Sequence, residues 1–365
     1  MDETEQAIYA AAGETFNINS PKQLGVILFE KLGLPHGKKT KTGWSTNADV
    51  LEKLRYDAPI VADVLRYRQY AKLKSTYVDG LMKVIEPDGR VRTSFQMTVT
   101  ATGRLSSTEP NLQNIPTRTE LGSQLRRMFT APEGCVLVDA DYSQIELRLL
   151  AHIAGDTEMQ AAFRSGEDFH TVTASRVFHV EPQEVTPEMR RRAKAVNFGI
   201  VYGISAFSLA QDIGVSVAEA KAYMERYFET YQGVRQYMTD VVAKAEQDGY
   251  VQTLMHRRRA LPELKSSNFN MREFGKRVAL NMPVQGTAAD IMKLAMVRVH
   301  HRLKREGLRA RLLMQVHDEL IVECPASERE QVERLLTEEM EQAAQLSVPL
   351  IAEAHSGKNW LAAKE

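Results

Sequence analysis

The chain has 365 residues, of which 43% are hydrophobic, and its 47 basic and 47 acidic side chains give a formal net charge of +0. A chain of this length can bury a large core and is expected to divide into two or three subdomains. No apolar run is long enough to cross a membrane, and the acidic start is unlike a secretory signal. The two cysteines, Cys135 and Cys324, lack paired spacing, which argues against a disulfide framework and a zinc site. We therefore expect a cytoplasmic protein.

The first part of the chain, residues 1–92, carries mainly helical patterns, which a loop at residues 35–43 interrupts. Strand-like apolar runs occupy residues 93–147 and return at 296–365, and the stretch between them is mainly helical. Both strand-bearing stretches also carry an acidic motif. We therefore expect the two stretches to meet in one sheet, which gives an α+β fold.

The first acidic motif covers residues 141–148 and follows the apolar run at 136–138. Asp141 is therefore predicted at the end of a buried strand, where the chain leaves the sheet. A structural alternative stays open, because Asp is common at strand ends, where its side chain caps backbone N–H groups.

A helix is predicted to begin at Thr186, which Pro187 follows, and to end at Gly203. The arginines at 190–192 lie in its first turns, where the helix dipole disfavours each cation by roughly 0.3–1 kcal/mol. An anion supplied from outside the helix would remove this penalty.

Two cations and two rings follow one side of this helix at a spacing of four residues: Arg190, Lys194, Phe198 and Tyr202. This order suits a triphosphate, then a sugar, then a base. The alternative, an ordinary basic surface helix, is equally compatible with the helix alone.

The second acidic motif covers residues 315–319 and lies between the apolar runs at 312–314 and 320–322, so His317 and Asp318 are predicted at the tip of a hairpin. Two strand-borne carboxylates brought side by side raise each other's pKa unless they share a cation. A pair of divalent metals usually provides that cation, and phosphoryl transfer is its usual chemistry.

Together these segments resemble family A DNA polymerases of the polymerase I type. The three segments are similar to that family's motifs A, B and C in turn. Further family-like segments occur in the family's order, at residues 102–107 (TGRLSS), 111–116 (NLQNIP), 281–290 (NMPVQGTAAD) and 357–360 (GKNW). The resemblance covers nearly the whole chain and identifies it as a bacterial, Klenow-like polymerase-domain fragment.

The resemblance implies a right-hand architecture with an antiparallel palm sheet, helical fingers and a helical, partial thumb. The thumb would span residues 1–92, the palm 93–147 and 296–365, and the fingers 148–295. Nothing in the sequence resembles a proofreading or 5′-nuclease domain, so we expect polymerisation without proofreading. Such an enzyme would be a monomer that acts in DNA replication or repair on primer–template DNA and deoxynucleoside triphosphates.

The resemblance also implies a metal site. Asp141, Asp318 and the backbone carbonyl of Tyr142 would bind two Mg²⁺ ions, with Glu319 in a supporting catalytic role because adjacent strand residues point to opposite faces. Asp139 precedes Asp141 by two residues and departs from this pattern, since it adds a negative charge on the same face. It either has a basic partner or is a third, distant ligand.

Substrate contacts follow from the same resemblance. Lys194 would be catalytic and would hold the triphosphate with Arg190. The remaining nucleotide contacts would be Gln144, Glu146, His170, Phe198 and Tyr202. The DNA contacts would be Arg104, Asn111, Asn114, Arg277, Gln285 and His317.

Glu146 is expected to exclude ribonucleotides, because its carboxylate would fill the space that a 2′-hydroxyl needs. Tyr202 is the expected hydrogen-bond partner of Glu146, and an ion pair with Arg148 or another cation is the structural alternative. Although the net charge is +0, basic clusters at residues 38–41, 190–194 and 256–259 allow one face to attract DNA.

Rival enzyme classes lack their motifs. No P-loop and no nucleophile elbow occurs in the sequence. A scaffold that binds primer–template DNA without extending it remains the main alternative.

Overall fold

The computed structural model describes residues 1–37, 39–40, 43–117 and 119–364. Lys38 and Lys41, in the first of the basic clusters, lie outside this part of the chain. The chain divides into two compact units, one formed by Met1–Ser94 with Ile115–Leu125 and the other by Phe95–Asn114 with Arg126–Glu365. Every predicted site residue belongs to the second unit.

The first unit is mainly helical, as predicted for residues 1–92, and it has its own apolar core. Ile8, Leu28 and Val64 have no exposed surface in this core. A proline opens two of the helices at a position where the missing N–H costs nothing. Its elements are α1 (Asp2–Ala12), α2 (Pro21–Gly25), β1 (Lys39–Thr40), β2 (Gly43–Trp44), α3 (Ala48–Leu54), α4 (Pro59–Lys72), α5 (Gly80–Met82) and α6 (Glu120–Gln124), with π-helical turns at Val26–Lys31 and Leu73–Asp79.

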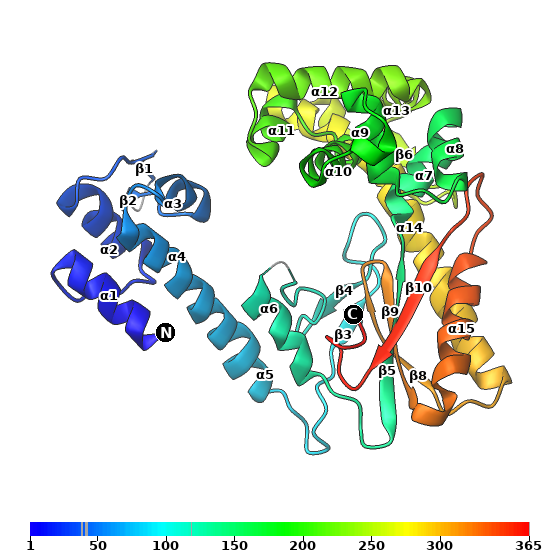
Figure 1. Cartoon of the computed structure of the whole chain (residues 1–365), viewed down its shortest axis with the longest axis horizontal. Coiled ribbons are helices and arrows are strands. Elements are labelled where there is room, and N and C mark those ends of the chain that lie inside the picture. Colours follow the sequence, from blue (N-terminus) through cyan, green and yellow to red (C-terminus); the bar gives the residue numbers. More distant parts are fainter. Residues whose placement is uncertain (38, 41–42, 118, 365) are drawn as a thin grey trace. The chain divides into compact units, whose positions relative to one another are not determined.

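The second unit is built on a four-stranded antiparallel sheet with the strand order β10-β5-β9-β8 (Figure 1). Its strands are β5 (Cys135–Tyr142), β8 (Arg311–Val316), β9 (Glu319–Pro325) and β10 (Ala352–Gly357). The two distant strand-bearing stretches therefore meet in one sheet, and the predicted α+β class is confirmed. Helix α15 (Arg329–Glu341) packs against β5 and β10.

A helical region follows β5 and includes the predicted helix at 186–203. Thr186 accepts a hydrogen bond from the N–H of Met189 at 3.2 Å, and Gly203 has φ +65° just beyond the end of the helix. The helices here are α7 (Ile145–Ile153), α8 (Thr157–Arg164), α9 (Phe169–Phe178), α10 (Pro187–Val201), α11 (Ala206–Ile213), α12 (Val217–Thr230), α13 (Gln232–Asp248) and α14 (Phe269–Arg305). Short strands complete the unit: β3 (Ser94–Gln96), β4 (Ser106–Thr108), β6 (Tyr250–Gln252) and β7 (Arg258–Ala260).

Helix α14 is 37 residues long and continues through the predicted border between residues 295 and 296. Its internal Pro283 does not interrupt the helix, and the Thr287 hydroxyl donates to the Pro283 carbonyl one turn earlier at 2.6 Å. In the described part of the chain, no helix combines the length and the hydropathy that crossing a bilayer would require.

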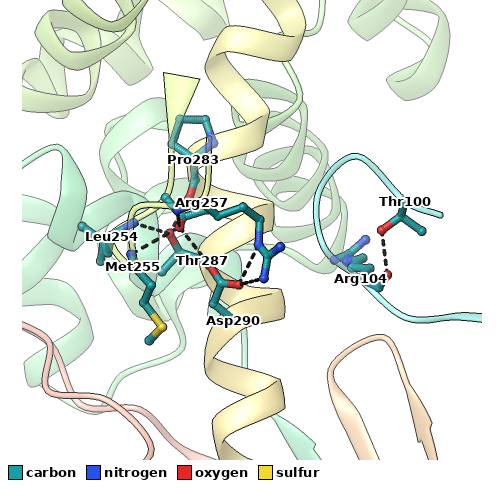
Figure 2. A network of polar contacts seen from close by, with 9 residues as sticks. Thr100, Arg104, Leu254, Met255, Arg257, Pro283, Thr287 and Asp290 are labelled. Atoms are coloured by element: carbon teal, nitrogen blue, oxygen red, sulfur yellow. Dashed lines mark hydrogen bonds and ion pairs between the residues drawn. The ribbon is translucent and has the colours of Figure 1, made fainter. Parts of the chain in front are cut away.

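Arg257 forms an ion pair with Asp290 of α14 and lies against the loop that carries Arg104 (Figure 2). The Arg257 guanidinium donates to Asp290 Oδ1 through Nε at 2.8 Å and through Nη2 at 2.7 Å. Gly103 has φ +82°, and a Cβ there would lie 2.6 Å from Arg257 Nε. The loop is closed by the Thr100 hydroxyl, which donates to the Arg104 carbonyl at 2.6 Å. Arg257 thus packs under the backbone next to Arg104.

We expect Asp290→Ala to lower the free energy of unfolding by about 1–3 kcal/mol, because it leaves the Arg257 guanidinium without its carboxylate partner. Urea unfolding of the two proteins measures the difference. Glu225→Ala is the matched control, since it breaks only the exposed pair with Lys221 and should cost about 0–1 kcal/mol. An Asp290→Ala midpoint equal to that of the parent would contradict a stabilising role for this pair.

Candidate active site

The two acidic motifs meet at one end of the sheet. Asp141 lies directly opposite Glu319 in the register of β5 and β9, and the β8–β9 turn consists of His317 and Asp318. The Tyr142 N–H donates to the Asp318 carbonyl at 3.1 Å, which ties this turn to the end of β5. Burial is the main cause that raises the pKa of Asp318 well above its usual range, and the negative charge of Asp141 is the second. The strand bounds confirm the predicted positions of Asp141 at a strand end and of His317 and Asp318 at a hairpin tip.

The predicted orientation of Glu319 is wrong. The prediction requires Asp318 and Glu319 to be neighbours on one strand, but Asp318 belongs to the turn and Glu319 begins β9. Directly opposite residues of an antiparallel pair share a face, so Glu319 shares the face of Asp141. Its Oε2 accepts a hydrogen bond from Lys364 Nζ, and its Oε1 lies 3.5 Å from Arg126 Nη1.

The extra carboxylate of Asp139 has basic and polar partners. It is 2% exposed, and its Oδ2 accepts a hydrogen bond from Trp360 Nε1 at 3.1 Å. Lys364 Nζ lies 3.7 Å from its Oδ1. Burial is the main cause that raises the pKa of Asp139, and the negative charge of Glu319 is the second. Of the two alternatives for Asp139, the contacts favour a basic partner.

The donor set at this end of the sheet suits Mg²⁺. Asp141 Oδ1 is buried without a hydrogen-bond partner in the described chain, so one carboxylate oxygen is available to a ligand. The described residues contain no cluster of three or more His, Cys, Asp or Glu side chains placed to enclose a metal. Mg²⁺ binds through one or two carboxylates and keeps water or phosphate oxygens at its other coordination positions. Asp141 and Asp318 can supply these two carboxylates.

The cationic stripe of α10 is present, and its first member is already paired. Arg190 donates through Nε and Nη2 to the two oxygens of Asp168 at 2.9 and 2.8 Å. Partial burial acts against ionisation of Asp168, but hydrogen bonds from Arg190 and Thr171 outweigh it and hold the Asp168 pKa at about 2. Lys194 is exposed and forms no ion pair with any described residue.

His170 lies next to this stripe and is 3% exposed, with Nδ1 3.0 Å from Asn197 Nδ2. Burial lowers the His170 pKa to about 4. Its ring is therefore neutral at pH 7 and can offer a phosphate a hydrogen bond but no charge. The ring of Phe198 is half-buried, with its centroid 5.7 Å from that of His170.

Glu146, on α7, links three segments. Tyr202 donates its hydroxyl to Glu146 Oε2 at 2.6 Å, so the predicted hydrogen bond is present. Arg104 Nη2 donates to Oε1 at 2.6 Å, and Arg148 instead donates to the carbonyls of Ser143 and Pro349. The cation that pairs with Glu146 is therefore Arg104, which was predicted as a DNA contact. Just before α7, Gln144 adopts φ +55°.

The other predicted DNA contacts are mostly at the surface. Asn111, Asn114, Arg277 and His317 are exposed, and Gln285 is half-buried on α14. Arg277 lines a cavity of about 480 Å³ with Phe198 and Tyr202. Sequence reasoning missed Lys364 and Arg126, which contact the acidic motifs. No periodicity could have revealed Lys364, since 223 positions separate it from Asp141.

Comparisons with known proteins agree with this geometry. The profile of DNA polymerase family A matches residues 1–362. DNA polymerase I of Bacillus caldotenax is 58% identical over 363 residues, which cover 99% of this chain and 41% of the relative. DNA polymerase I of Bacillus subtilis is 57% identical over 366 residues, which cover 100% and 42%. The chain thus spans about two fifths of the length of these curated relatives.

A solved structure is also similar, the POL domain of Pol1 from M. smegmatis in complex with DNA primer-template and dNTP. It superposes with a TM-score of 0.94 at 49% identity, covering 100% of this chain and 65% of that one. The fold is therefore that of a right-hand polymerase domain with an antiparallel palm sheet. With the family profile matched along almost its full length and the acidic motifs joined in one sheet, the chain belongs to DNA polymerase family A.

Proposed function

We propose that this chain is a template-directed DNA polymerase that adds deoxynucleotides to a primer 3′-hydroxyl by two-metal phosphoryl transfer, in replication or repair. One observation supports this above all: the Tyr142 N–H donates to the Asp318 carbonyl, which holds the turn that carries Asp318 at the strand end that carries Asp141. The M. smegmatis domain binds DNA primer-template and dNTP, according to the description of its structure, which agrees with the proposal.

In this proposal Asp141, Asp318 and the Tyr142 carbonyl hold two Mg²⁺ ions. Bound there, the ions would lower the pKa of the primer hydroxyl and offset the charge on the leaving pyrophosphate. The chain's own task is to bring the primer hydroxyl and the triphosphate together and to hold them there. Glu319 keeps Lys364 and Arg126 beside the carboxylates and so stabilises this arrangement.

The triphosphate would lie along α10. No described residue forms an ion pair with Lys194, which can therefore contact a phosphate directly, whereas Arg190 must share its guanidinium with Asp168 or leave it. His170, as a neutral imidazole, would donate a hydrogen bond to a phosphate. Phe198 would pack on the nucleotide and Tyr202 near the templating base, while Gln144 and Glu146 would face the sugar.

Sequence choice would come from base pairing with the template. Arg104, Asn111, Asn114, Arg277, Gln285 and His317 would contact primer and template. Such contacts can check pair geometry, because minor-groove acceptors are shared by all correct pairs. We further propose residues 1–92 as thumb, 93–147 and 296–365 as palm, and 148–295 as fingers, in a cytoplasmic monomer without proofreading.

The first test of the proposal removes a metal ligand. Asp141→Ala and Asp318→Ala should each abolish Mg²⁺-dependent primer extension, with a rate loss on the order of a thousandfold, because transition-state stabilisation depends on the metals. Binding of primer–template DNA should stay close to that of the parent. Both quantities are measured on the same preparations, by single-turnover extension and by fluorescence anisotropy.

Asp240→Ala, which lies on α13, is the control for this test and should extend at the parental rate. In parallel, a mismatched primer end incubated without nucleotides should not be shortened by the parent. Near-parental extension by either active-site variant at saturating Mg²⁺ would refute the two-metal assignment. DNA binding without extension by the parent would instead support a non-enzymatic scaffold.

A second test concerns the triphosphate. Lys194→Ala should raise the apparent Kd for the nucleotide far more than the Kd for DNA, because this exposed ammonium has no ion-pair partner among the described residues and is free to bind a phosphate. The slope of log DNA affinity against log salt should barely change, whereas loss of a true backbone contact would lower it by about one unit. Lys221→Ala, on α12, is the charge-matched control. A slope change of that size in Lys194→Ala would place Lys194 on the DNA path.

The third test addresses sugar selection. Glu146→Ala should narrow the preference for deoxynucleotides over ribonucleotides by roughly a hundredfold in relative kcat/KM, since it opens the space that a 2′-hydroxyl needs. It should also lower overall activity, because Arg104 and Tyr202 both lose their shared acceptor.

Tyr202→Phe separates these two effects, because it removes one hydrogen bond to Glu146 and keeps the carboxylate in place. The measurement is insertion of a single matched deoxy or ribo nucleotide by the parent and both variants. A deoxy-to-ribo ratio that is unchanged in Glu146→Ala would exclude Glu146 as the sugar gate.

A further inference from the structure

Lys364 lies at the centre of the acidic face of the sheet. Its Nζ is 2.8 Å from Asp141 Oδ2 and 3.7 Å from Asp139 Oδ1, and it also donates to Glu319 Oε2. One ammonium therefore contacts three carboxylates that come from two neighbouring strands. Such an arrangement offsets the repulsion that like charges on one face would otherwise cause.

The position of Lys364 is fixed by the segment that follows β10. Trp360 is 1% exposed, and its backbone N–H donates to the Phe129 carbonyl at 2.9 Å. A Cβ at Gly357 would lie 2.6 Å from the backbone of Ala362, so the segment folds back closely over that glycine. The Lys364 N–H then donates to the Leu361 carbonyl at 3.0 Å. The lysine is held by a folded turn.

The neighbouring cation does not duplicate this role. Arg126 lies 3.5 Å from Glu319 Oε1 and stacks over the Trp360 ring at 4.0 Å. In the described part of the chain, Lys364 is the only side chain that forms an ion pair with Asp141. Asp141 therefore has one oxygen bound to an internal cation and one buried oxygen without a hydrogen-bond partner.

We propose that Lys364 is a positioning residue that acts as the internal counter-cation of Asp141. Without metal, Lys364 occupies Oδ2 of Asp141 and keeps the carboxylates together. When a divalent ion binds Asp141, the ammonium remains with Asp139 and Glu319. This inference rests on the proposed function, because it takes Asp141 to be a metal ligand.

The proposal has a defined consequence for metal affinity. A positive charge within a few ångströms of a divalent ion repels it, and the ammonium also competes for one of the two oxygens of Asp141. Both effects weaken metal binding, so removing the ammonium should tighten it, by roughly tenfold. A purely structural lysine would have the opposite effect, because the carboxylates would separate when it was removed.

The experiment measures Mn²⁺ binding directly, without DNA or nucleotide. The full chain is titrated with Mn²⁺, and the free ion is followed by electron paramagnetic resonance. Lys364→Ala should bind Mn²⁺ roughly tenfold more tightly than the parent, and Lys364→Arg, which keeps the charge, should stay close to the parent. Lys358→Ala removes one charge from the same segment without touching the three carboxylates, and it controls for net charge.

Unchanged or weaker Mn²⁺ binding by Lys364→Ala would overturn the counter-cation role, and so would equal tightening by Lys358→Ala. If Lys364→Ala does not fold, Lys364→Gln keeps a hydrogen-bonding side chain without the charge and must show the same tightening. Asp141→Ala distinguishes a failure of the counter-cation role from a failure of the proposed metal site. Loss of the Mn²⁺ site in that variant would support the proposed metal ligand, whereas unchanged binding would refute the proposed function itself.

Discussion

Electrostatic repulsion between carboxylates at one end of a sheet is the constraint on which the second unit depends. The antiparallel pairing of β5 and β9 places Asp141 opposite Glu319, with Asp139 on the same face and Asp318 in the adjoining turn. Like charges in such positions destabilise a sheet. Two cations and one hydrogen-bond donor offset this repulsion, namely Lys364, Arg126 and Trp360. Arg126 precedes β5 in the sequence, whereas Trp360 and Lys364 follow β10. The fold therefore holds an acidic site together before any metal is considered.

A second carboxylate organises the region where the helices meet the sheet. Glu146 is buried on α7, accepts from Tyr202 at the end of α10, and accepts from Arg104 in a loop that precedes β5. That loop is supported in turn by Arg257 and by Asp290 on α14. The residue proposed to select the sugar is thus connected to four separate segments. In the proposed function, a change at Arg257 or Asp290 would therefore reach the sugar site through Arg104, without a contact to the nucleotide.

Features with a local signal could be predicted from the sequence, and features set by distant contacts could not. The end of β5, the hairpin tip and the bounds of α10 follow from an apolar run, a turn and a cap. The face of Glu319 was mispredicted because the turn, not the strand, contains Asp318. The pairing of Arg190 with Asp168 and the place of Lys364 depend on how remote segments pack, which no spacing in the sequence encodes.

Helix α14 fixes the distance between two of the residues that are proposed to contact DNA. Arg277 and Gln285, both proposed to contact DNA, are eight residues apart on this continuous helix, which corresponds to a rise of about 12 Å. That distance is close to three or four nucleotide steps along one strand, at about 3.4 Å each. Because the helix runs without a break through Pro283, the spacing does not depend on any loop. In the proposed function, the helix would therefore place Arg277 and Gln285 against positions of a newly formed duplex that lie three or four nucleotide steps apart.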